Sequence, residues 1–332
     1  MKIGNRVFDT DNNTFVMGIL NITPDSFSDG GRFVVSNWEG ADINQVLRAC
    51  DEMLAYGADI IDVGGESTRP GAAPVSATEE MGRVIPVVEA ITKRFDAVVS
   101  VDTYKAEVAG EAVRAGARLI NDIWGLKGDE LMPKAVAEIM GAYDGVALCI
   151  MHNRKPVNTD NAHGMQDNGR ESGLPDIPIT MHGEDTDYGY RKSGTAVPRA
   201  DEDLFMEDVI EDLRQSIGLA KAAGVDTHKI ILDPGVGFAK TYEQNLAVMR
   251  RMDELRRAGM TDPYITDHEF PILLGSSRKS VIGKALDAGV DKRLAGTLAT
   301  TAFAYMTGVD FVRVHDVREN AEVIKMLKAI RG

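Results

Sequence analysis

Short runs of apolar, often β-branched residues alternate along the chain with longer stretches that have helical periodicity. These runs lack the alternation of polar and apolar residues that a half-exposed strand shows, so they predict parallel strands covered on both faces. The segment 205–223 places an apolar residue at every third or fourth position, which predicts a helix with one buried face. Eight runs are predicted strands: residues 14–20, 59–63, 97–101, 117–120, 145–150, 229–232, 271–274 and 309–314.

Helical stretches separate the predicted strands, and several of them end in a glycine within a few residues of the next strand. Gly57, Gly116, Gly224 and Gly308 occupy this position, and glycine is the residue that most often ends a helix before a short loop. Repetition of a strand and a helix eight times predicts a closed (β/α)8 TIM barrel in preference to an open doubly wound sheet. We therefore expect an α/β protein with one domain that spans residues 1–332.

One segment interrupts this alternation. Residues 153–203 contain six glycines and four prolines and show no sustained period, so they predict an irregular insertion in the barrel after the fifth strand. A surface excursion, a lid over a site and an oligomer contact are the open interpretations of this insertion.

Composition narrows the classes of partner. The chain has 51 acidic and 37 basic residues, and its formal net charge of −14 disfavours a general binder of nucleic acid or of anionic membranes. The two cysteines, Cys50 and Cys149, lie in apolar surroundings and are predicted to be buried free thiols. Because the sequence contains neither an apolar leader nor an apolar run of about 18 residues, we expect a cytoplasmic protein.

Polar and charged residues follow the predicted strands at their carboxyl ends. One aspartate after a strand is usually the N-cap of the next helix, but polar groups at all eight strand ends are too many for that explanation alone. In a barrel these ends converge on one rim, where active sites are built. The candidate site residues are Asn21, Thr68, Arg69, Asp102, Asn121, Asp233, Ser277, Lys279, Arg313 and His315.

The residue types indicate the chemistry of the ligand. Asp102, Asn121 and Asp233 suit a flat heterocycle whose edge presents several N–H groups, because a carboxylate can accept two parallel hydrogen bonds. Basic residues suit a phosphate or pyrophosphate joined to that heterocycle. The segment GSSRKS lacks the spacing of a nucleotide-binding P-loop, which disfavours a nucleoside triphosphatase. The basic candidates are Arg69, Arg278, Arg313 and His315.

Seven motifs in order resemble the signatures of the dihydropteroate synthase family. The first is MGILNITPDSFSDGGRF at residues 17–33, and the second is DIIDVGGESTRPGA at residues 59–72. The resemblance covers essentially the whole chain except residues 153–203. The other five motifs are VSVDTYKAEVA, LINDIWGL, ILDPGVGF, LLGSSRKSVIG and FVRVHDV.

The resemblance implies a transferase of folate biosynthesis. Family members condense 6-hydroxymethyl-7,8-dihydropterin pyrophosphate with p-aminobenzoate and release 7,8-dihydropteroate and pyrophosphate. They use Mg²⁺, are commonly homodimers and are the targets of sulfonamides. By resemblance, Asp102, Asn121, Asp233 and Lys279 hold the pterin ring.

The remaining roles also follow from the resemblance. Asn21, Arg313 and His315 take the pyrophosphate, with Asn21 also ligating Mg²⁺. Thr68 and Arg69 reach the pyrophosphate or the second substrate from a loop at residues 65–74, which would close over the substrates together with the loop at residues 21–32. Ser277 faces the carboxylate of p-aminobenzoate. The residues expected to act in catalysis are Asp102, Asp233, Lys279 and Arg313.

The chemistry explains why no Ser/His/Asp or Cys/His nucleophile is evident. An arylamine is already nucleophilic when neutral, so the harder task is the departure of pyrophosphate from the pterin CH₂ group. Cations on the leaving group and carboxylates beside the ring favour a dissociative displacement. Two alternatives stay open: a pterin-dependent methyltransferase, which needs no pyrophosphate-binding cluster, and a paralogue that binds pterin without turnover.

Overall fold

All eight predicted strands are present and lie parallel in one sheet, although their bounds shift by up to two residues. The computed structural model describes residues 1–10, 13–22, 43–67, 72–153, 199–260, 266 and 268–332. The strands are β3 (Phe15–Asn21), β4 (Ile60–Gly64), β5 (Val98–Asp102), β6 (Leu119–Asp122), β7 (Ala147–Met151), β8 (Ile230–Asp233), β9 (Leu273–Leu274) and β10 (Phe311–Val314).

The sheet is nearly closed into a barrel. Its strand order is β8-β7-β6-β5-β4-β3-β10-β9, and a parallel bridge between Leu232 and Ile272 joins the two ends. The Leu232 N–H donates to the carbonyl of Pro271 at 2.9 Å across the same gap. This ring with helices between its strands confirms the prediction of an α/β barrel.

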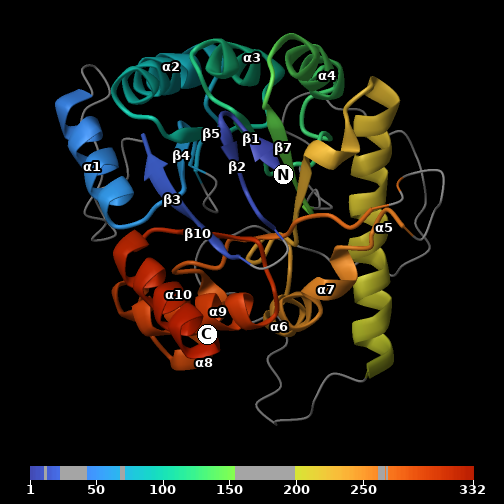
Figure 1. Ribbon diagram of the computed structural model, residues 1–332. Helices are drawn as coiled ribbons and strands as arrows, with labels where there is room; N and C mark the ends of the chain where they lie inside the picture. The colour runs from blue at the N-terminus through green and yellow to red at the C-terminus, as the bar shows by residue number, and fades with distance from the viewer. Residues whose placement is uncertain (11–12, 23–42, 68–71, 154–198, 261–265, 267) are drawn as a thin grey trace.

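Helices surround the barrel (Figure 1). Serine and threonine caps fix two of their starts: Ser76 Oγ accepts from Glu79 N–H at 3.2 Å, and Thr241 forms a capping box with Gln244. The helices are α1 (Ile43–Ala55), α2 (Ala77–Arg94), α3 (Ala106–Arg114), α4 (Met132–Ala142), α5 (Arg199–Ala223), α6 (Tyr242–Arg250), α7 (Met252–Leu255), α8 (Ser280–Leu286), α9 (Leu294–Met306) and α10 (Val317–Arg331), with short 3₁₀ turns η2 (Thr227–Lys229) and η3 (Val290–Lys292).

The long insertion falls largely outside the described residues, which exclude 154–198. Helix α5 already begins at Arg199, so residues 199–203 are helical and the prediction that they are irregular is wrong. The acidic residues Asp201 and Glu202 in the first turn of α5 favour this earlier start, because they interact well with the helix dipole. Both cysteines are buried and free, as predicted. No helix in the described part of the chain is long and apolar enough to cross a membrane.

Apolar side chains fill the barrel from its amino end. Each of the eight strands contributes at least one residue to this inner layer, and a hairpin formed by β1 (Lys2–Ile3) and β2 (Arg6–Val7) covers it from below. Phe8 follows the hairpin and its ring lies 4.8 Å from that of Phe15 and 5.6 Å from that of Phe311. The inner layer comprises Ile3, Phe8, Met17, Ile60, Val98, Leu119, Ala147, Cys149, Ile231, Leu273 and Phe311.

A second, larger apolar layer lies between the barrel and the helices. The amino end of the barrel is therefore sealed by hydrocarbon, and the opposite end is the one at which polar side chains can reach a ligand. This division is why a site at the carboxyl rim tolerates buried charge without disturbing the packing below it.

Removal of the Phe8 ring tests the role of the hairpin as the floor of the barrel. Phe8→Ala should lower the free energy of unfolding by about 3–5 kcal/mol, because the ring is fully buried and its cavity cannot collapse against the strands. Val7→Ala is the matched control: its side chain is 73% exposed, and the change should be within about 0.5 kcal/mol. Urea unfolding measures both. Equal losses of unfolding free energy in the two variants would contradict a stabilising role of the Phe8 ring.

Candidate active site

Three of the predicted site residues are brought to one level of the barrel by the strand register, with Gly64 between two of them. Asn21 of β3 pairs with Gly64 of β4, Gly64 pairs with Asp102 of β5, and Asp102 pairs with Asn121 of β6. Gly64 leaves room between its neighbours: a Cβ there would lie 3.6 Å from Asn21 Oδ1 and 3.7 Å from Asp102 Oδ2. Two acceptor oxygens from different strands therefore face the space above this glycine.

Arg313 of β10 is held between two carboxylates inside the barrel mouth. Its Nε donates to Asp62 Oδ2 at 2.6 Å and its Nη2 donates to Asp102 Oδ2 at 2.5 Å. Burial disfavours the charge on Arg313, but the nearby carboxylates of Asp62 and Asp102 outweigh it and raise the pKa of the guanidinium. Burial also raises the pKa of Asp102 to about 7, against the opposing attraction of Arg313.

Asp233, Lys279 and Arg313 approach one another around a second glycine. A Cβ on Gly275 would lie 3.7 Å from Asp233 Oδ2, 3.8 Å from Lys279 Nζ and 4.0 Å from Arg313 Cβ. Burial lowers the pKa of Lys279 to about 8, although Asp233 favours its charged form. Burial raises the pKa of Asp233, which Lys279 opposes. The mouth therefore holds acidic and basic groups whose charges depend on one another.

Two further predicted residues meet at the rim after β9 and β10. Ser277 Oγ lies 3.0 Å from His315 Nδ1 and accepts from the His315 N–H at 3.2 Å. Arg278 forms a two-point ion pair with Asp316, with Nε–Oδ2 at 3.0 Å and Nη2–Oδ1 at 2.5 Å. Arg278 was a candidate cation for phosphate, but its guanidinium is already paired with Asp316 and holds the loop before α10.

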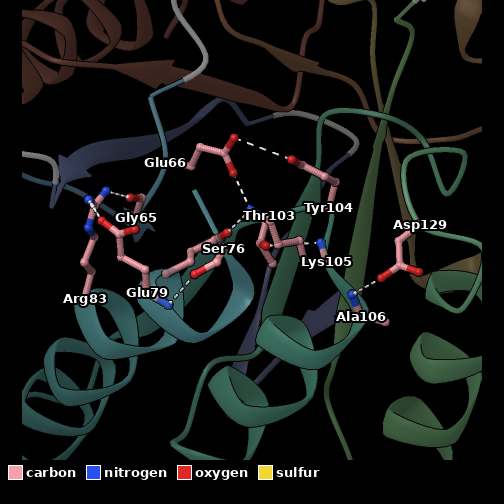
Figure 2. Close-up of polar contacts among 11 residues, drawn as sticks. Gly65, Glu66, Ser76, Glu79, Arg83, Thr103, Tyr104, Lys105, Ala106 and Asp129 are labelled. Carbon is pink, nitrogen blue, oxygen red and sulfur yellow. Dashed lines mark hydrogen bonds and ion pairs between the residues drawn. The ribbon is translucent and has the colours of Figure 1, made fainter. Parts of the chain in front are cut away.

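An ion cluster joins the loops after β4 and β5 at the same rim (Figure 2). Lys105 Nζ donates to both Glu66 and Glu80, and Glu80 is almost fully buried. Burial alone would lower the pKa of Lys105, but these two carboxylates raise it. Arg83 Nη1 donates to the carbonyl of Gly65 at 2.7 Å. The first residues of the β4–α2 loop are thereby fixed to the next loop and to α2.

The structure brings most of the predicted site together. Thr68 and Arg69 lie outside the described residues, as do residues 23–32 of the predicted loop at residues 21–32. Asp122, which also ends β6, is a structural group, because its carboxylate accepts from the N–H groups of Trp124 and Leu126 at 2.8 and 2.7 Å. The remaining candidates at the carboxyl ends of the strands are Asn21, Asp102, Asn121, Asp233, Ser277, Lys279, Arg313 and His315.

Sequence reasoning missed the partners that hold these groups. Asp62 is the single charged residue in the apolar strand IIDVG, and a charge buried in such a strand needs a partner. This isolation is the sequence signal that could have identified it. Glu66 and Lys105 gave no comparable signal, because single charges in loops are usually solvated. No cluster of three His, Cys, Asp or Glu side chains suited to a metal ion occurs within the described ranges.

Comparisons with known proteins agree with this geometry. A family model described as pterin binding enzyme matches residues 17–315. The dihydropteroate synthase of Clostridium beijerinckii is 44% identical over 331 residues, covering 99% of this chain and 99% of the relative. The match covers nearly the full length of both chains, so it also spans the predicted insertion at residues 153–203.

Two solved structures are also similar. The dihydropteroate synthase of Clostridium difficile, solved in the presence of pteroic acid, has a TM-score of 0.72 at 40% identity and covers 98% of this chain and 99% of its own. The Yersinia pestis dihydropteroate synthase, solved as a sulfonamide drug complex, has a TM-score of 0.75 at 35% identity and covers 100% of this chain and 98% of its own.

Proposed function

The chain belongs to the dihydropteroate synthase family of pterin-binding transferases, and we propose that it condenses 6-hydroxymethyl-7,8-dihydropterin pyrophosphate with p-aminobenzoate. The products are 7,8-dihydropteroate and pyrophosphate. The observation that carries this proposal is the meeting of Asp102, Asp233, Lys279 and Arg313 in one buried barrel mouth. Such a set pairs hydrogen-bond acceptors for a heterocycle with cations for a phosphorylated leaving group.

The pterin ring would bind deepest, among the groups that are least exposed. Asn121 and Asp233 are buried at the ends of β6 and β8, and their oxygens can accept from the amino-pyrimidinone edge. Lys279 Nζ is the matching donor for the ring carbonyl, since it lies close to Asp233 around Gly275. Ser277 stands beside this group and would face the carboxylate of p-aminobenzoate.

The pyrophosphate would lie toward β3 and β10, held by Asn21, Arg313 and His315. The amide oxygen of Asn21, which faces the space above Gly64, fits a hard cation such as Mg²⁺, because Mg²⁺ binds few protein oxygens and keeps phosphate and water as its other ligands. Asn21 would supply its amide oxygen as the ligand. When bound, Mg²⁺ would neutralise charge on the departing pyrophosphate.

The protein's own part in the chemistry is electrostatic. The arylamine attacks as the neutral base, so no side chain has to remove its proton beforehand. Carboxylates of Asp102 and Asp233 beside the ring stabilise the positive charge that the pterin CH₂ acquires as its C–O bond to pyrophosphate breaks. Arg313 keeps Asp102 in place and presents the rest of its guanidinium to the leaving group. This arrangement favours a dissociative displacement.

The basic groups also separate this proposal from its alternatives. A pterin-dependent methyltransferase has no leaving pyrophosphate and no use for Asn21, Lys279, Arg313 and His315 together. A paralogue without turnover would be expected to have lost one of these positions. Each of them is present in the chain: Asn21 ends β3, Lys279 directly precedes α8, Arg313 lies in β10 and His315 follows β10.

An enzymatic assay with one variant tests the proposal. With both substrates and Mg²⁺, the chain should release pyrophosphate and form dihydropteroate in equal amounts, and removal of Mg²⁺ with EDTA should stop the reaction. Asp102→Asn should lower kcat by about 10²- to 10³-fold and change the affinity for pterin much less, because the lost charge matters most in the transition state.

Steady-state kinetics and calorimetric titration with pterin measure these two effects separately. Equal losses of kcat and of pterin affinity in Asp102→Asn would contradict the role of its charge in the transition state. No pyrophosphate release by the unaltered chain would instead favour a paralogue that only binds pterin.

We also propose that two copies of the chain associate through the face formed by α8, α9 and α10, which lie together in Figure 1. Helix α9 turns Thr297 and Thr301 inward and leaves two apolar side chains outside, Phe303 at 40% and Met306 at 74% exposure. Leu286, the last residue of α8, is also exposed. Association of two copies through this face would remove these exposed apolar side chains from water.

Sedimentation equilibrium tests the association. The unaltered chain should sediment as a dimer and Phe303→Glu as a monomer, since a buried unpaired carboxylate opposes association. Leu131→Glu is the control, because Leu131 is 66% exposed before α4 and outside this face, and it should leave the dimer intact. A monomer for the unaltered chain, or dissociation by the control alone, would contradict this face as the interface.

A further inference from the structure

We propose that Lys240 is a positioning residue: its ammonium group organises the turn at residues 235–240 that holds Lys279 in the barrel mouth. Lys240 does not belong to the set of residues expected to touch the substrates. Its part would be to fix the backbone on which a substrate-binding side chain rests. This inference rests on the proposed function for the identity of the ligand.

Lys240 is the last residue of the turn, and its ammonium group contacts two carbonyls of the turn and one side chain outside it. Its Nζ donates to the carbonyl of Gly235 at 3.0 Å and to that of Phe238 at 3.2 Å. It also lies 2.6 Å from His152 Nδ1 at the end of β7. Because an ammonium group has only donors, Nδ1 must accept, and the fully buried His152 is therefore neutral in this arrangement. One charged group thus joins the turn to the neighbouring strand.

The turn needs such a support because its backbone is unusual. Gly235, Gly237 and Ala239 have φ values of +66°, +82° and +45°, and a non-glycine residue in this region is strained. A Cβ on Gly235 would lie 2.0 Å from the carbonyl oxygen of His152, so the turn rests directly on the end of β7. The hydrogen bonds of Lys240 to the carbonyls of Gly235 and Phe238, which both precede Ala239 in the turn, offset the strain at Ala239.

Lys279 depends on the same turn. Its Nζ donates to the carbonyl of Val236 and lies 4.5 Å from the centre of the Phe238 ring. A Cβ on Gly237 would lie 2.8 Å from Lys279 Cδ, so the lysine stem packs against the bare backbone of the turn. Lys240 holds the carbonyl of Phe238 and that of Gly235, which directly precedes Val236. Loss of Lys240 would therefore free the two residues that Lys279 contacts, Val236 and Phe238.

The turn also reaches Asp233. The Gly235 N–H donates to Asp233 Oδ1 at 2.7 Å, and the Gly237 N–H donates to Asn245 Oδ1 at 2.6 Å. The charges of Lys279 and Lys240 both oppose the effect of burial on Asp233. Lys240 therefore supports both Asp233, the expected acceptor for the pterin ring, and Lys279, the expected donor to it.

The test compares pteroic acid binding by the unaltered chain and by Lys240→Met over a range of pH. Lys279 faces Asp233, Arg313 and Asp102, and its pKa of about 8 predicts that binding by the unaltered chain weakens above that pH, as Lys279 loses its proton. Lys240→Met should weaken binding about tenfold at neutral pH, because Lys279 is no longer held in place. Loss of the Val236 acceptor also favours the neutral amine, so the alkaline loss of binding should move to lower pH.

Two further variants make the result specific. Leu255→Ala opens a cavity at a fully buried position of α7 away from the turn, and it should lower Tm without moving the pH profile. Lys240→Gln keeps a donor but removes the charge; it should move the profile in the same direction as Lys240→Met, and it replaces that variant if Lys240→Met does not fold.

An unchanged profile, or a shift to higher pH as loss of a nearby positive charge alone would give, overturns the positioning role. If the unaltered chain does not bind pteroic acid at any pH, the proposed function fails instead, and the two failures are therefore distinct.

Discussion

The barrel mouth depends on one buried cation, Arg313, held between Asp62 and Asp102. Removing an ion pair's partner from a buried site costs several kcal/mol, roughly 3–5, because it leaves a charge without solvent or counter-ion. Loss of any one of these three side chains would therefore leave a buried charge without its partner. Lys279 and Asp233 extend the same arrangement by balancing each other nearby. A ligand that enters this mouth meets charges whose positions are set before it arrives.

The supports behind these charges form a second ring around the mouth. Gly64 and Gly275 supply space for groups from neighbouring strands, and the turn beneath Lys279 supplies its acceptor. Glu66 and Lys105 fix two adjacent loops at the rim. Preorganisation of this kind reduces the rearrangement needed when charge develops on a substrate. The sealed apolar floor below allows the mouth to remain polar without exposing the core.

Much of the architecture could be predicted from the sequence because parallel strands covered on both faces are readable as apolar runs, and their carboxyl ends converge by rule. Asp102, Asn121 and Asp233 were found in this way. The supporting residues could not be, since their partners are distant in sequence: Lys240 meets His152 across 88 positions. The inward direction of Asp62 was equally hidden, because a strand without alternation does not reveal which residues face the barrel axis.

Asp62 lies two residues deeper in β4 than Gly64, the partner of Asp102, and we expect it to affect activity only through Arg313, which it holds. The most direct test is kcat/KM for the pterin substrate in Asp62→Asn, which preserves shape and removes one charge. We expect a loss of at least about tenfold, equivalent to roughly 1.4 kcal/mol, in a variant that stays folded. A folded Asp62→Asn enzyme with unchanged kcat/KM would contradict it.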